Sequence, residues 1–130
     1  MQEKTMYWLD LADDDLKVAK TMLNNAHYLH MGFLCHLTIE KALKAAIEHT
    51  TNEIPPKIHD LRKLAKQGGI FDKLSAKQSK LLDALMPLQI EARYPEYKEK
   101  IAQTLSKDVC EKFLAETEEL LCWIKQLLGK

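Results

Sequence analysis

Glycine and proline are scarce in this sequence, with four of each among 130 residues. Both residues interrupt helices, so their scarcity favours long helical segments. The alternation of apolar and polar residues that would indicate strands is also missing. The composition therefore predicts an all-α chain.

Cysteine is present only as Cys35, Cys110 and Cys122, an odd number at wide spacings and without a C-x-x-C pair. A disulfide framework needs paired cysteines, and a zinc site needs ligands at short, regular spacings. Neither pattern occurs here. We therefore expect reduced thiols and no metal site.

Neither sign of charge is in excess, because 19 Lys and Arg residues balance 19 Asp and Glu residues. A protein that coats nucleic acid or lies on an anionic membrane usually needs a basic excess. The chain also lacks an apolar run near the ~18 residues of a membrane span, and its N-terminus lacks the pattern of a signal peptide. We expect a cytoplasmic protein without membrane attachment, in which a local basic groove is not excluded.

Apolar residues recur every three or four positions along most of the chain, which is typical of helices. One such stripe covers about residues 4–24, a second runs from Met31 to Ala46, and a short helix is expected over about 59–67. Ser75 begins a further helical run, and Ser106 can cap a long last helix. The length suits a single domain over residues 1–130. These segments predict an up-and-down antiparallel bundle of four to five helices.

Pro87 lies inside the run that begins at Ser75. Proline removes a backbone donor and crowds the preceding turn, so we expect a kink or an early helix end there.

The second expected helix carries polar residues beside its apolar stripe. His36, Glu40 and Lys44 are four residues apart, so they share one edge of the helix. A Glu followed four residues later by a Lys is also an ordinary stabilising pair on a solvated face. Considered alone, these residues favour that structural interpretation over a functional one.

His59 and Asp60 follow a loop that contains two prolines. Either residue could cap the helix that begins there, whereas the imidazole of His59 could instead exchange a proton near neutral pH. His59 is the best single candidate for a functional histidine, and both interpretations remain open.

Arg93 and Tyr94 precede Pro95 at a junction between expected helices. Arginine offers a rigid fork for a phosphate or carboxylate, and tyrosine offers a flat face and a hydroxyl group. Equally, Arg93 could pair with a carboxylate of a neighbouring helix while Tyr94 fills the core.

Three segments together resemble the HEPN domain family (higher eukaryotes and prokaryotes nucleotide-binding). They are Ile39–Ala45 (IEKALKA), His59–Leu61 (HDL) and Ala92–Pro95 (ARYP), and the match extends from about Tyr7 to Trp123. The resemblance implies a helical bundle that is usually a homodimer. It also implies a small nucleotidyltransferase as partner, often in a toxin–antitoxin pair.

Other members of that family are metal-independent RNases that use an Arg followed four to six residues later by a His. Neither Arg62 nor Arg93 is followed by a histidine at that distance, so we do not expect independent catalysis. Two alternatives remain: an RNase in which Arg93 and His59 meet in space, and a purely structural dimerisation module.

The bundle domain of antibiotic nucleotidyltransferases is also similar, and it bears a carboxylate and a lysine four residues apart. By that resemblance Glu40 would accept a proton and Lys44 would hold a phosphate. The chain itself would carry no cofactor, while ATP or another nucleotide, or RNA, would bind, with Mg²⁺ at the partner's site. Glu40 and His59 are the expected catalytic residues, and the expected nucleotide or phosphate contacts are His36, Lys44, Asp60, Arg93 and Tyr94. All of them except His36 are expected to converge on one cleft.

Overall fold

The computed structural model describes residues 1–90, 99–100 and 102–129, and within these ranges every regular element is helical. The elements are α1 (Glu3–Asn24), α2 (Tyr28–Thr51), α3 (Leu61–Gln67), the 3₁₀ helix η1 (Phe71–Lys73), α4 (Ala76–Ile90) and α6 (Lys107–Leu127). The predicted all-α helical bundle is confirmed.

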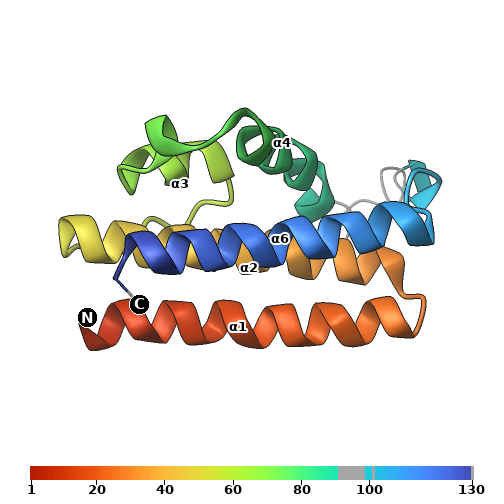
Figure 1. Cartoon of the computed structure of the whole chain (residues 1–130), viewed down its shortest axis with the longest axis horizontal. Helices are drawn as coiled ribbons and strands as arrows, with labels where there is room; N and C mark the ends of the chain where they lie inside the picture. The colour runs from red at the N-terminus through yellow and green to blue at the C-terminus, as the bar shows by residue number, and fades with distance from the viewer. Residues whose placement is uncertain (91–98, 101, 130) are drawn as a thin grey trace.

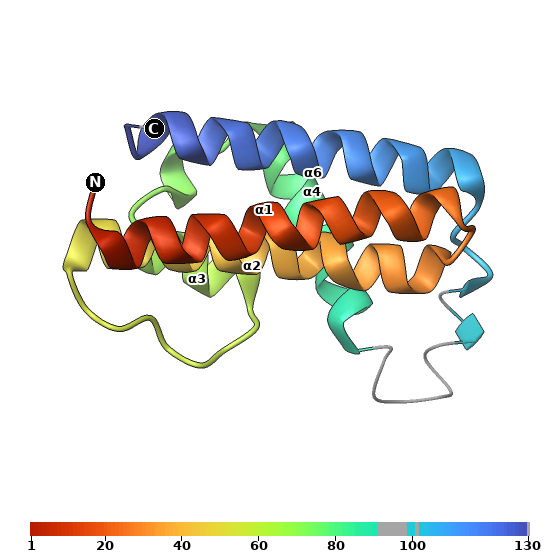
Figure 2. The same ribbon diagram turned by 90° about the horizontal axis from the view of Figure 1, so that it is seen from below.

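The three long helices run alongside one another, and the shorter ones lie across them (Figure 1). α1 and α2 form an antiparallel pair, and α6 runs beside α2, so both chain ends lie at the same end of the bundle (Figures 1 and 2). α3 and α4 cover the side of α2 and α6 that faces away from α1. α2 is therefore the central helix, in contact with α1, α3, α4 and α6.

The core forms where the apolar stripes of these helices meet. Leu9, Ala12 and Leu16 of α1 are buried, and so are Ile39 and Leu43 of α2. Full burial of one such leucine or isoleucine contributes about 1.5–3 kcal/mol. The stripe expected over residues 4–24 is thus the surface by which α1 packs on α2.

Side-chain caps mark the beginnings of two helices as expected. The Ser75 hydroxyl accepts a bond from the Gln78 backbone N–H at 3.1 Å, and the Gln78 side chain accepts one from the Ser75 N–H at 2.9 Å. Ser106 Oγ accepts from the Val109 N–H at 3.2 Å and caps α6. The capping residues were therefore readable from the sequence.

Two helix ends differ from the expectation. α2 continues to Thr51, whose hydroxyl bonds to the Ile47 carbonyl at 2.8 Å, and it ends only at Asn52, which has a positive φ of 59°. α4 continues through Pro87 to Ile90, so the early end expected at Pro87 is wrong. The helix continues although Pro87 has no N–H to bond to the carbonyl four residues earlier, so α4 lacks one backbone hydrogen bond at this point.

The close approach of α3 to α2 fixes the loop between them, residues 52–60. Gly68, at the end of α3, lies so near α2 that a Cβ atom there would be 3.1 Å from Cβ of Ala46. Pro55 is buried in the loop and Pro56 half-buried. The loop lies beside α2, at the end of the bundle where the two chain termini also lie (Figure 2).

Among the helices that the structure describes, none is both long and apolar enough to cross a membrane.

Candidate functional site

The polar row of α2 is buried rather than solvated. His36 is 0% exposed, Glu40 4% and Lys44 8%. The interpretation of Glu40 and Lys44 as a pair on a solvated helix face is therefore wrong, although the pair itself forms. The row is covered by residues from α1, from α4 and from the loop before α3, so it is a point where several elements meet.

The carboxylate of Glu40 is at the centre of this cluster and has three nitrogen partners. Its Oε1 atom is 2.8 Å from Nδ1 of His59 and 3.3 Å from Nε2 of His36. Its Oε2 atom accepts a bond from Nζ of Lys44 at 3.2 Å. We call these four residues the Glu40 cluster.

The Glu40 carboxyl is held in its ionised form. Burial on its own would raise the pKa of Glu40, but the hydrogen bonds from His36 and His59 and the nearby Lys44 ammonium outweigh it and lower the pKa to about 2. A carboxylate with so low a pKa is a weak proton acceptor near neutral pH. The geometry thus suits Glu40 to positioning its neighbours more than to acting as a base.

His36 connects the cluster to α4. Its Nδ1 atom is 2.9 Å from the backbone carbonyl oxygen of Leu85, and its Nε2 atom faces Glu40. A carbonyl oxygen can only accept, so Nδ1 carries a proton and donates it to this bond. His36 is therefore a buried side chain that links α2 to α4, and each of its two ring nitrogens has a hydrogen-bond partner.

Lys44 lies against an aromatic ring that the sequence did not link to it. Its Nζ atom is 5.7 Å from the centre of the Trp8 ring, a cation–π contact that adds to its bond with Glu40. No local spacing relates residue 8 to residue 44, so only the pairing of α1 with α2 reveals this contact.

His59 is the open member of the cluster, with 43% of its side chain exposed. It belongs to the loop between α2 and α3, and its Nδ1 atom is fixed by Glu40. Among the described residues, none bonds to its Nε2 atom. Its second ring nitrogen is therefore open to a hydrogen bond with a molecule outside the cluster.

Asp60, also expected as a nucleotide contact, caps α3 instead. Its Oδ1 atom accepts bonds from the backbone N–H groups of Arg62 and Lys63, both at 3.1 Å. The capping interpretation of this residue, left open by the sequence, is therefore the one that the structure shows. It fixes the point at which the loop bearing His59 joins α3.

We expect Asp60→Ala to lower the free energy of unfolding by about 1 kcal/mol, because two backbone donors lose their acceptor. Asp60→Asn should stay near wild type, since asparagine caps equally well. Urea unfolding of the three proteins measures this. Equal losses in both variants would show that the charge of Asp60, and not its capping bond, is what matters.

Of the seven expected site residues, the structure brings four together: His36, Glu40, Lys44 and His59. Asp60 adjoins them but bonds to α3. Arg93 and Tyr94 lie outside the described residues. Across the described ranges, no group of three or more His, Cys, Asp or Glu side chains is arranged to hold a metal ion.

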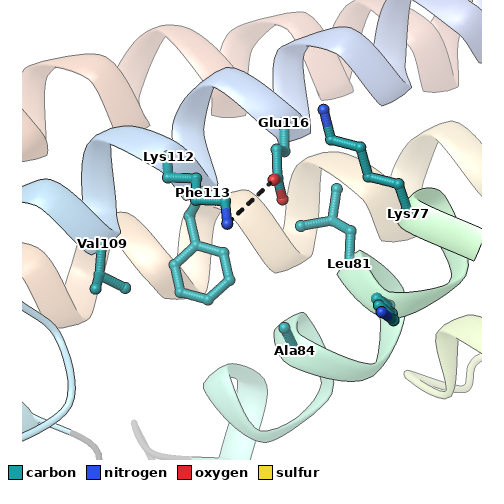
Figure 3. A pocket seen from close by; sticks show the side chains of 8 residues that line it. Lys77, Leu81, Ala84, Val109, Lys112, Phe113 and Glu116 are labelled. Atoms are coloured by element: carbon teal, nitrogen blue, oxygen red, sulfur yellow. Dashed lines mark ion pairs between the residues drawn. The ribbon is translucent and has the colours of Figure 1, made fainter.

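A separate hollow of about 480 Å³ lies between α4 and α6 (Figure 3). Leu81, Ala84 and Phe113 form its apolar wall together with Val109, which is 39% exposed. The Lys112 ammonium at its edge lies 4.0 Å from the Glu116 carboxylate. None of the residues expected to function lines this hollow.

Comparisons with known proteins agree with the fold. TT1696 from Thermus thermophilus, known from a crystal structure, superimposes with a TM-score of 0.79 over 96% of this chain and 98% of its own. The two are 18% identical in sequence, so the likeness concerns the fold. No curated protein sequence matches the chain. The model of the HEPN domain family matches residues 5–127, nearly the whole chain. The chain belongs to the HEPN domain family.

Proposed function

We propose that this HEPN domain is a binding module for nucleotides and that the Glu40 cluster holds the phosphate. One observation carries the proposal: a single buried carboxylate is surrounded by an ammonium group and two imidazole rings, one of which opens to solvent. Three nitrogen groups that can donate hydrogen bonds therefore surround one carboxylate. A phosphate adds the acceptors that such a cluster lacks.

His59 is the residue that we expect to touch the ligand. Glu40 fixes its Nδ1 atom, so the exposed Nε2 atom is free to donate to a phosphate oxygen when the ring is protonated. Lys44 is 8% exposed and bonds to the other oxygen of the Glu40 carboxylate, so its charge adds to the local field. In this arrangement Glu40 is a positioning residue, which differs from the role of base that the resemblance to antibiotic nucleotidyltransferases implied.

The transfer chemistry would belong to a second protein. We propose that a small nucleotidyltransferase supplies Mg²⁺ and the catalytic carboxylates, and that this chain, as a homodimer, forms the other half of a toxin–antitoxin pair. Affinity purification from the native cells tests this part of the proposal. A nucleotidyltransferase in the eluate supports it, and its absence from repeated eluates contradicts it.

We expect His59→Ala to weaken the binding of ATP, GTP, CTP and UTP alike, by roughly tenfold or more, because one charge-assisted hydrogen bond to phosphate is lost. Isothermal titration calorimetry measures the four affinities. His49→Ala is the matched control, since His49 is an exposed histidine near the end of α2, outside the Glu40 cluster. Equal affinities for wild type and His59→Ala would refute the proposed phosphate contact.

The same proteins separate binding from catalysis. Cleavage of RNA by the purified chain, lost in His59→Ala and kept in His49→Ala, would show an RNase and overturn the proposal of a binding module. Intact RNA together with nucleotide affinity would support the module.

A further inference from the structure

A second pocket adjoins the Glu40 cluster where α1, the end of α2 and the loop meet. Its volume is about 460 Å³, and its lining includes Tyr7 and Trp8 from α1, Glu48 from α2, and Ile54 and Pro55 from the loop. We call it the Glu48 pocket. Trp8 connects it to the cluster, because Lys44 lies against the Trp8 ring and also bonds to Glu40.

Glu48 is the unusual residue of this pocket. It is only 2% exposed, and no described residue gives its side chain a hydrogen bond or an ion pair. Within the described ranges, the polar side-chain atoms that are both sealed from solvent and unpartnered are the hydroxyls of Thr5 and Thr117. The Glu48 carboxylate therefore still reaches the pocket, and burying it without donors is costly.

The pocket also offers aromatic faces. The Tyr7 and Trp8 rings meet edge to face, with centroids 6.0 Å apart and planes at 71°. Tyr7 is 61% exposed, which is unusual for so large a ring. An exposed aromatic side chain beside a concave surface is a typical platform for stacking a planar ligand.

The surrounding charges select among planar ligands. Glu3 and Lys4 both line the pocket and offset each other, while the Lys44 ammonium occupies one side of Trp8 and disfavours a cationic ligand there. A neutral ring with two neighbouring N–H donors satisfies both oxygens of Glu48 without adding charge. Guanine has this arrangement at N1–H and the N2 amino group, whereas adenine has an acceptor at N1 that would face the carboxylate.

We propose that the Glu48 pocket binds the guanine base of a nucleotide, with Glu48 accepting bonds from N1–H and N2–H beside the rings of Tyr7 and Trp8. This inference rests on the proposed function, because the phosphate of the same nucleotide would be held by His59 and Lys44. It makes the module selective for guanine nucleotides.

The test uses the fluorescence of Trp8. The chain has two tryptophans, Trp8 and Trp123, so Trp123→Phe leaves Trp8 as the only one. In this background we titrate GMP, IMP and AMP, which carry the same phosphate but present two donors, one donor and no donor at positions N1 and C2 of the base, the side that would face Glu48. We expect affinity to fall in that order, with GMP at least tenfold tighter than AMP.

Glu48→Gln should lower the affinity for GMP by tenfold or more, since glutamine replaces one acceptor by a donor. The affinity for AMP should stay within about twofold of wild type. Glu53→Gln is the matched control, because it removes the same charge from the exposed part of the loop. Tyr7→Ala, at an exposed position, should weaken all three nucleotides through lost stacking and provides a second variant.

The outcomes separate this inference from the proposed function. Equal affinity for GMP and AMP, or no effect of Glu48→Gln, would overturn guanine selectivity while the phosphate site stands. If His59→Ala lowers the affinity for all three nucleotides equally and GMP still binds more tightly than AMP, both the phosphate site and the guanine site are supported. If none of the nucleotides binds, both are overturned.

Discussion

Glu40→Gln should lower the free energy of unfolding by about 3–5 kcal/mol at neutral pH, the usual cost of breaking a buried ion pair by removing one partner. The amide cannot neutralise Lys44, whose side chain is only 10% exposed, and it places a donor among the donors of His36 and His59. Urea unfolding followed by circular dichroism measures the loss.

Two further variants make the result specific. Asp15→Asn breaks the pair of Asp15 with Lys41, whose Nζ and Oδ2 atoms are 2.6 Å apart but whose side chains keep about a fifth of their surface exposed. It should cost about 1 kcal/mol or less. The double variant Glu40→Gln with Lys44→Met should lose less than Glu40→Gln alone, because the unpaired ammonium is gone. A loss in Glu40→Gln no larger than in Asp15→Asn would contradict the central position of Glu40.

Acid should remove about 3 kcal/mol of stability through Glu40 alone. The pKa of this carboxyl falls from its ordinary 4.5 to about 2 in the folded protein, and each pKa unit corresponds to about 1.4 kcal/mol. Because the folded state holds the proton more weakly than the unfolded state, the contribution is complete above pH 4.5. It declines as the pH falls from there towards 2.

The comparison of wild type with Glu40→Gln isolates this effect, since other carboxylates titrate in both proteins. Unfolding free energies at pH 6, 5, 4 and 3 should differ most at pH 6, and the difference should shrink below pH 4.5. A difference that stays constant down to pH 3 would show that the Glu40 pKa is not lowered in the folded state.

The helices were largely predictable because their causes are local. The stripe of Leu9, Ala12 and Leu16 and the cap at Ser106 depend on residues within a turn or two of one another. The errors arise where the burial of a residue depends on how the helices pack against one another. Val109 lies in the first turn of α6 and is 39% exposed at the hollow between α4 and α6, which its local sequence does not indicate.

The candidate site was predictable only in part. The four-residue spacing of His36, Glu40 and Lys44 identified the polar row, and continuing it by four more residues would have pointed to Glu48. Their burial was not predictable, since it depends on contacts with Trp8, Leu85 and His59 that no local pattern encodes. The functional roles of these residues stay predictions until the variants are measured.

The loop of residues 52–60 has a consequence for affinity. Pro55 and Pro56 each fix their own φ angle, and both ends of the loop are anchored, by the end of α2 at Asn52 and by the bonds of Asp60 at the start of α3. A chain so restricted has little conformational entropy left to lose when a ligand arrives. His59, which directly precedes Asp60 and whose Nδ1 atom is held by Glu40, is therefore preorganised, so less of the free energy of its contact with a ligand is spent on ordering the loop.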